Sequence, residues 1–140
     1  MRMILADTGF WIAYYEDRDV HHQAAISIMD SYTAGIFLFP WPLYYEVLRT
    51  RFVRRAGWVE SFSQIARSAK LRVIDDVSYR ERALEETLDI SQRERGISLV
   101  DSVIRGVLCD PNISIIEMVT FNVKDFQDVC GRRGVQIRSR

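Results

Sequence analysis

Residues 3–11 of the chain read MILADTGFW. An apolar run is followed by one acid, a small polar pair and an aromatic segment. This pattern is typical of a buried parallel strand that brings a single carboxylate, Asp7, to the edge of a sheet. Ligands of open α/β sheets bind outside the carboxyl ends of the strands, so Asp7 is a candidate reaction-site residue. The competing interpretation is that Asp7 only caps the following helix, because Asp is a preferred N-cap residue.

Length and composition indicate one soluble globular domain over residues 1–140. The chain has 140 residues, of which 48% are hydrophobic and 27% are charged, and this is enough to build a core. No apolar run approaches the ~20 residues that a membrane span needs. Asp7 interrupts any signal-peptide core, so we expect a cytoplasmic protein without membrane contact. Cys109 and Cys130 have no metal-ligand spacing and are interpreted as small apolar residues.

Apolar runs alternate with helical patterns along the whole chain. Strands are predicted at 3–6, 36–39, 71–74, 114–121 and 135–137. Helices are predicted at 10–15, 20–32, 42–55, 58–69, 78–90, 97–108 and 122–129. In the helix that follows Ser78, the residues expected to face the core are Ala83, Leu84, Leu88 and Ile90. Strands separated by helices imply a parallel sheet that is covered on both faces.

Two further acids lie where they could join Asp7. Glu46 belongs to the predicted helix that Pro42 starts, and its simplest interpretation is an exposed pair with Arg49 one turn later. Asp101 follows Ser98 as in a capping box, which is also a sufficient explanation on its own. However, the helix around Asp101 is apolar over a broad arc, so this carboxylate is expected to be partly buried and to need a partner.

The last polar group lies at a predicted strand-to-helix junction. Asn122 follows an apolar strand and Asp125 comes one turn later. Asn122 as N-cap and Asp125 as the acid of the first turn would explain both residues without any chemistry. If the acids do converge at one sheet edge, they repel one another and stay ionised only beside a divalent cation. Oxygen ligands favour Mg²⁺ or Mn²⁺ over zinc.

The ordered set of motifs resembles a known family. The motifs of this set are ILADTGFWI at 4–12 with Asp19 and His22 downstream, Tyr45-Glu46, SLVDS at 98–102 and VTFNVKDF at 119–126. With these gaps, essentially the whole chain resembles the PIN-domain ribonucleases, and most of all the VapC-type toxins of prokaryotic toxin–antitoxin pairs. The resemblance implies a three-layer α/β/α sandwich around a parallel sheet of about five strands in the order 3-2-1-4-5.

The resemblance also implies Mg²⁺- or Mn²⁺-dependent endonucleolytic cleavage of RNA. Asp7 and Asp101 would be the main metal ligands and Glu46 the third acid. Asn122 stands where the family usually has Asp, which leaves a second metal in doubt, and Asp125 could compensate for it. A homodimer and a cognate antitoxin that inserts near the active site are implied as well. The supporting hydroxyls would be those of Thr8 and Thr120, which could position phosphate or water.

Basic residues offer contacts for RNA although the net charge is zero. Of the 19 basic residues only Lys70 and Lys124 are lysines, and arginine binds phosphate in a bidentate way and stacks on bases. Arg49, Arg51 and Arg105 are the candidates for RNA contact, whereas solvated helix faces account for most arginines in most proteins.

Two other functions compete with a ribonuclease. A PIN-like module that binds RNA or protein with weak or no catalysis is favoured by Asn122. A phosphatase or receiver-like domain is ranked low, because Gly9 stands where a second acid is expected two residues after Asp7.

Overall fold

A five-stranded parallel sheet forms the centre of the molecule. The computed structural model describes residues 2–140, and the strand order is β3-β2-β1-β4-β5. The strands are β1 (Met3–Ala6), β2 (Ile36–Pro40), β3 (Leu71–Ile74), β4 (Glu117–Val119) and β5 (Gln136–Arg138). All neighbouring strands are parallel. Central β1 pairs Leu5 with Leu38 on one side and with Met118 on the other. The predicted sheet order is therefore confirmed.

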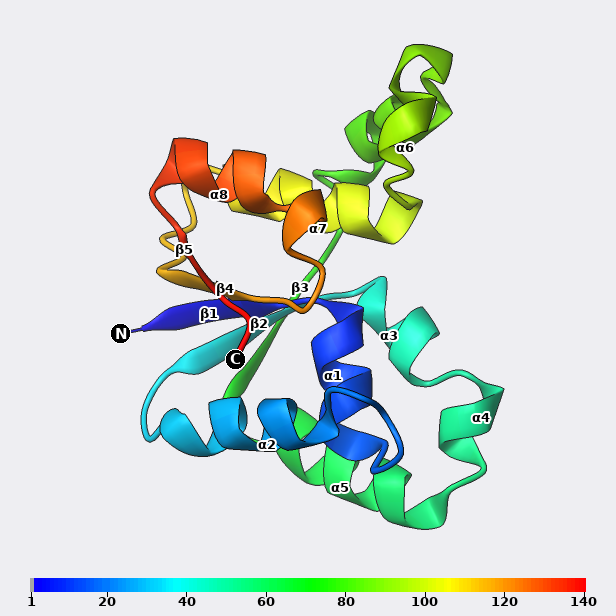
Figure 1. Ribbon diagram of the computed structural model, residues 1–140, viewed down its shortest axis with the longest axis vertical. Coiled ribbons are helices and arrows are strands. Elements are labelled where there is room, and N and C mark those ends of the chain that lie inside the picture. Colours follow the sequence, from blue (N-terminus) through cyan, green and yellow to red (C-terminus); the bar gives the residue numbers. More distant parts are fainter. Residues whose placement is uncertain (1) are drawn as a thin grey trace.

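Helices cover both faces of the sheet and give three layers (Figure 1). One face carries α1 (Thr8–Tyr15), α2 (His22–Ser31) and α5 (Ala56–Ala66), and the other carries α7 (Leu99–Cys109) and α8 (Gln127–Arg133). Between β2 and α5 lie α3 (Leu43–Val47) and α4 (Thr50–Val53). The 3₁₀ turn η2 (Val123–Asp125) precedes α8. Beyond α7, the helix α6 (Arg80–Leu88) and the 3₁₀ turn η1 (Ile90–Arg95) project from the body.

An aromatic core under α1 fixes the strand that carries Asp7. Phe10 and Trp11 are fully buried, although α1 has only eight residues. The Trp11 ring meets Phe37 and Phe39 edge to face, with centroids 5.3 and 5.6 Å apart. Such pairs add roughly 0.5–1.5 kcal/mol each to the burial of their area. Because α1 packs directly after β1, the residue between them has little freedom to move.

The helix predicted at 42–55 is broken into α3 and α4. Arg49 has extended backbone angles, φ −72° and ψ 168°, and becomes the residue before α4. The break lets Arg49 and Arg51 both reach the buried carboxylate of Glu16, at 2.6 and 3.0 Å. It also buries the side chain of Phe52 completely. These contacts stabilise the break, so tertiary interactions override the local helical pattern.

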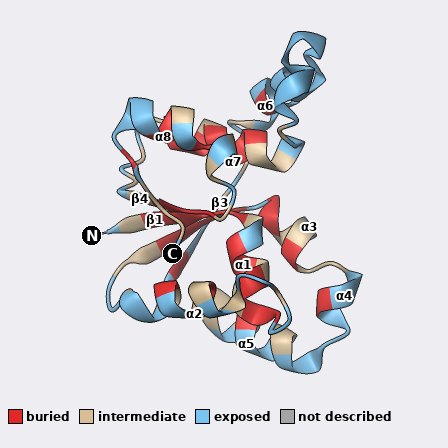
Figure 2. Ribbon diagram, viewed as in Figure 1, coloured by how far each residue is buried: buried red, intermediate tan, exposed pale blue. Residues whose placement is uncertain are grey.

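Three other segments differ from the prediction. The helix predicted at 122–129 is instead the 3₁₀ turn η2 followed by α8, which runs on to Arg133. The fourth strand covers only Glu117–Val119 instead of 114–121, because β1 and β5 offer only short ladders on either side. The helical region after Ser78 was expected to have a core face, but Leu84, Leu88 and Ile90 are 46%, 69% and 75% exposed. Figure 2 shows α6 and η1 mostly in the colour of exposed residues. Ala83 is the buried residue of α6. No helix within residues 2–140 is long and apolar enough to cross a membrane.

Candidate active site

The topology brings four acids to the carboxyl edge of the sheet. Asp7 directly follows β1, and Glu46 lies in α3, directly after β2. Asp125 lies in η2, just beyond β4. Asp101 lies in the first turn of α7, which leads back to β4 through the 110–116 connection. A helix that precedes a parallel strand starts at the carboxyl edge, so Asp101 faces the same region as the other three.

Asp7 is buried and fully engaged by donors. Its Oδ1 accepts from the amide of Phe10 at 3.0 Å, which makes Asp7 the N-cap of α1. Its Oδ2 accepts from the hydroxyl of Thr120 at 2.6 Å. Burial raises the pKa of Asp7 above its usual value of 3.8, and the charges of Asp125 and Glu46 add to this, while the two hydrogen bonds oppose it. Capping and a role in the site are thus combined in one residue.

Asp101 has the clearest electrostatic signature of a functional acid. Ser98 caps α7 by accepting from the Asp101 amide at 3.1 Å, as in the predicted capping motif. Burial raises the pKa of Asp101 from 3.8 to about 7, and the charges of Asp7, Asp125 and Glu46 contribute in that order. Perturbation by several nearby acids in a partly buried position is typical of functional sites.

The remaining polar residues of the cluster are tied to hydroxyl or amide donors. Thr8 donates its hydroxyl hydrogen to Oε1 of half-buried Glu46. Asn122 donates its side-chain amide to Oδ2 of Asp125. Its backbone amide donates to the hydroxyl of Thr120 at 2.9 Å. Asn122 stands at the N-cap position of η2 and Asp125 in its first turn, as predicted, but the side chain of Asn122 makes no capping hydrogen bond.

No cation of the described residues offsets these negative charges. Within residues 2–140, none of the ion pairs involves Asp7, Glu46, Asp101 or Asp125. Acids this close destabilise one another when ionised, and a divalent cation relieves that repulsion. The atoms that these side chains offer to a metal are all oxygens, and oxygen ligands are typical of Mg²⁺ and Mn²⁺ sites. The chemistry of the donor set therefore fits such an ion.

The acids do not form a ready-made metal cage. Among residues 2–140, no three His, Cys, Asp or Glu side chains are grouped as ligands of one ion. The carboxylates of Asp7, Glu46 and Asp125 also accept hydrogen bonds from protein donors. Mg²⁺ usually keeps several waters and binds through one or two carboxylates, so a complete cage is not required for it.

The arginines considered for RNA contact are engaged within the protein. Arg49 and Arg51 bind Glu16, whose side chain is only 5% exposed. Arg105 is buried and forms a bidentate pair with Asp128 at 2.7 and 2.8 Å. Asp128 did not emerge from the sequence as a site residue. The available signal was Arg105 itself, because an arginine within an apolar helix requires a buried acid.

Solved structures share this fold, whereas sequence comparisons give no match. Neither protein-family models nor curated proteins match the chain. The structure of VapC20 from Mycobacterium tuberculosis, described as a sarcin–ricin loop cleaving toxin, superposes with a TM-score of 0.69 at 23% identity. The match covers 89% of this chain and 94% of that one. A chain of VapBC2 from Rickettsia felis, bound to a DNA fragment from their promoter, gives 0.58 at 12% identity over 97% of both chains. The chain therefore has the fold of VapC20, and the predicted PIN-like fold is confirmed.

Proposed function

We propose that this protein is a Mg²⁺- or Mn²⁺-dependent endoribonuclease and the toxin of a toxin–antitoxin pair. One observation carries the proposal: Asp7, Glu46, Asp101 and Asp125 come from four separate elements to one sheet edge. There burial, together with the charges of the other three acids, raises the pKa of Asp101 to about 7. Acids that perturb one another in this way lower the stability of the fold, and such clusters are typical of functional sites. The fold shared with VapC20, a toxin that cleaves the sarcin–ricin loop, supports the same conclusion.

Each residue is assigned the role that the family resemblance implies for its position. Asp7 and Asp101 are assigned as the main metal ligands, with Glu46 as the third acid. The chemistry that Mg²⁺ or Mn²⁺ supplies when bound is Lewis acidity, which activates water and offsets charge on the phosphodiester. Thr120 and Thr8 hold the carboxylates of Asp7 and Glu46 in orientation through their hydroxyl groups.

Position 122 carries Asn where the family usually has Asp, and we assign Asp125 as the acid that replaces it in the cluster. The amide of Asn122 donates to Asp125 Oδ2 and so orients this carboxylate. The charge of Asp125 acts on both Asp7 and Asp101. Asn122 brings an oxygen donor but no negative charge to the site.

The direct test is cleavage of RNA by purified protein freed of any antitoxin. We expect cleavage of RNA in Mg²⁺ or Mn²⁺ and none in EDTA, with a sarcin–ricin loop oligonucleotide, tRNA and mRNA as substrates. Asp7→Asn should abolish cleavage while leaving the far-ultraviolet circular dichroism unchanged. Glu60→Gln, an exposed acid of α5 outside the cluster, is the matched control and should cleave normally. If wild-type protein cleaves none of these substrates with either metal, the proposal is wrong.

A binding module without catalysis is the second candidate. Two observations favour it: Asn122 in place of an acid, and the lack of a ready-made ligand group within residues 2–140. Calorimetric titration with Mn²⁺ separates the two functions. The ribonuclease predicts binding that Asp7→Asn removes, whereas the module predicts no binding or the same binding in both proteins.

The partners follow from the proposed toxin function. A cognate antitoxin and a homodimer are proposed as the partners. Co-expression with the product of a short neighbouring reading frame should suppress growth arrest. Sedimentation of the purified protein should give the mass of two chains.

A further inference from the structure

Arg105 is a buried guanidinium one helical turn after Asp101. Both residues lie in α7, and only 9% of Arg105 is exposed. A buried arginine needs partners for its charge and for its N–H groups. The neighbouring elements supply both, and one of these partners belongs to the acid cluster itself.

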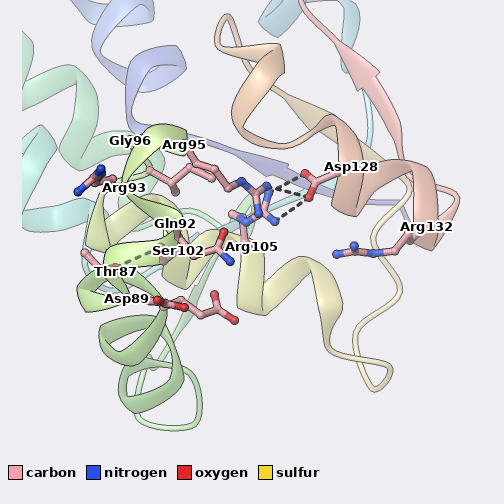
Figure 3. Close-up of a pocket in the computed structure, with 12 residues that line it drawn as sticks. Thr87, Asp89, Gln92, Arg93, Arg95, Gly96, Ser102, Arg105, Asp128 and Arg132 are labelled. Atoms are coloured by element: carbon pink, nitrogen blue, oxygen red, sulfur yellow. Dashed lines mark hydrogen bonds and ion pairs between the residues drawn. The ribbon is translucent and has the colours of Figure 1, made fainter.

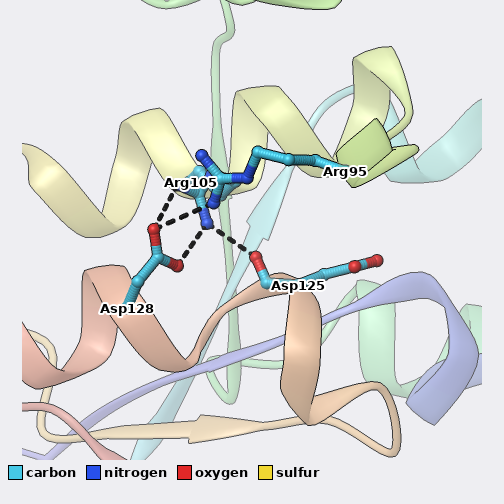
Figure 4. Close-up of polar contacts among 4 residues, drawn as sticks. All are labelled: Arg95, Arg105, Asp125 and Asp128. Carbon is cyan, nitrogen blue, oxygen red and sulfur yellow. Dashed lines mark hydrogen bonds and ion pairs between the residues drawn. The ribbon is translucent and has the colours of Figure 1, made fainter. Parts of the chain in front are cut away.

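Arg105 connects α7 to two positions on the other side of the site. Its guanidinium donates to both carboxylate oxygens of Asp128, at 2.7 and 2.8 Å. Nη1 also donates to the backbone carbonyl of Asp125 at 2.7 Å. Figure 4 shows the three bonds converging on one guanidinium. We call the unit of Arg105, Asp128 and the Asp125 carbonyl the clamp.

Arg95 adds a weaker contact from outside. It donates to Asp128 Oδ2 at 3.0 Å, and its side chain is 43% exposed whereas that of Arg105 is 11% exposed. Figure 3 shows both guanidinium groups meeting Asp128 at one side of a polar cavity of about 340 Å³. An exposed pair of this kind is screened by water and contributes little. Arg95 is therefore a natural control for Arg105.

The hydrogen bond from Arg105 to the Asp125 carbonyl is not needed to hold α7 against α8. Joining α7 to α8 needs only the ion pair between Arg105 and Asp128, which already gives a bidentate connection. The third bond holds the backbone of η2, the short turn that carries Asp125. The charge of the Asp125 carboxylate acts on both Asp7 and Asp101. Arg105 thus connects the helix that bears Asp101 to the residue that bears the fourth acid.

We propose that Arg105 is a positioning residue of the acid cluster, which holds η2 so that Asp125 faces Asp101. The proposal rests on the proposed ribonuclease function, since the clamp is assigned to the same site. Misplacement of a site group by about 1 Å can cost on the order of 10²-fold in rate. Arg105 touches neither substrate nor metal in this role, so its effect falls on kcat and not on KM.

The experiment compares four variants with the wild-type protein. Arg105→Gln should lower kcat by roughly 10- to 100-fold at an unchanged KM, by the misplacement argument. Arg105→Lys keeps the charge but not the forked geometry, so it should lie between Arg105→Gln and the wild type. Arg95→Gln should stay within about twofold of the wild type, because exposed pairs contribute little.

The fourth variant separates positioning from stability. In Arg105→Met/Asp128→Leu the ion pair is replaced by apolar side chains, a change that often keeps or raises stability. The double variant still lacks a donor for the Asp125 carbonyl. We therefore expect it to fold with a melting temperature near that of the wild type and to keep the low kcat of Arg105→Gln.

Hydrogen exchange gives a readout that does not depend on catalysis. The amides of Asp125 and Phe126 donate within η2, to Asn122 and Val123. In Arg105→Gln and in the double variant these two amides should exchange at least roughly 10-fold faster, while amides of β1 stay protected. Arg95→Gln should leave all of them unchanged.

Failure of the positioning role and failure of the proposed ribonuclease function give different results. Wild-type kcat or unchanged exchange at Asp125 in the double variant would overturn the positioning role, because the ion pair would then be purely structural. If the wild type cleaves no RNA, the proposed function fails by itself. In that case Mn²⁺ affinity decides: a loss of threefold or more in Arg105→Gln, but not in Arg95→Gln, supports positioning, and equal affinities overturn it.

Discussion

The hydroxyl of Thr120 donates to Asp7 Oδ2 at 2.6 Å, and thereby joins the residues that follow the neighbouring strands β1 and β4. Both side chains are buried, with 6% of Asp7 and 0% of Thr120 exposed. The backbone reinforces the junction, since the Asp7 amide donates to the Val119 carbonyl at 3.3 Å. A buried carboxylate in this position depends on the donors around it.

Removal of that hydroxyl is the first prediction. Thr120→Val keeps the shape of the side chain but leaves Asp7 Oδ2 without a donor, so we expect a loss of about 1–3 kcal/mol in the free energy of unfolding. Urea denaturation at pH 8 measures it. Thr120→Ser restores the donor and should recover most of the loss. Equal stability of the valine and serine variants would show that the bond is energetically neutral.

Asp101→Asn should make the metal-free protein more stable at pH 8. The folded-state pKa of about 7 lies above the ordinary 3.8, so between these values the folded chain binds more protons than the unfolded chain. The free energy of unfolding therefore falls as pH rises from about 4 to about 7, and the asparagine variant escapes this loss. We expect its melting temperature in EDTA to be higher by roughly 2–6 °C at pH 8 and equal near pH 4. A difference that does not change with pH would contradict the assignment.

Metal affinity should depend on pH through the same residue. A ligand carboxylate must be ionised to bind a cation, so protonation of Asp101 competes with Mn²⁺. With a pKa of about 7, the dissociation constant should be roughly 10-fold weaker at pH 6 than at pH 8. Calorimetry at both pH values measures it. Chelation with EDTA should remove all cleavage, and added Mn²⁺ should restore it; a constant affinity across this range would exclude Asp101 as a ligand.

Glu16 should be important for stability although it lies outside the acid cluster. Its buried carboxylate holds Arg49 at 2.6 Å and Arg51 at 3.0 Å. Removal of one partner from such a pair leaves uncompensated charge, so Glu16→Gln should lose about 2–4 kcal/mol in the free energy of unfolding. Glu86→Gln breaks an exposed pair on one helix and should lose less than about 0.5 kcal/mol. Similar losses in the two variants would show that burial does not matter here.

The sheet could be predicted because its signals are local. The two central strands β1 and β2 are apolar runs of a few residues, and Asp7 directly follows the first of them. Parallel connections then bring Asp101 and Asp125 to the same edge, whatever the detailed packing. Local patterns thus predicted a parallel sheet, and the family resemblance supplied the strand order that the structure has.

The helix break, the clamp and the exposure of α6 could not be predicted, because they depend on residues that are distant in the sequence. The break between α3 and α4 is stabilised by Glu16, 33 residues before Arg49. The clamp depends on Asp128, 23 residues after Arg105. The period of α6 suggested an apolar face at Leu84 and Leu88, but periodicity does not say whether anything covers that face. Pairings of this kind become visible only when the chain is folded.

The four acids are spread from residue 7 to residue 125, and this has a consequence during synthesis. A nascent chain that stops before η2 carries Asp7, Glu46 and Asp101 at most, and it also lacks the Asp128 that Arg105 binds. Under the proposed function, truncated translation products cannot cut RNA inside the cell that makes them. Activity then begins only after most of the polypeptide has left the ribosome, which leaves most of the elongation time for capture of the emerging toxin.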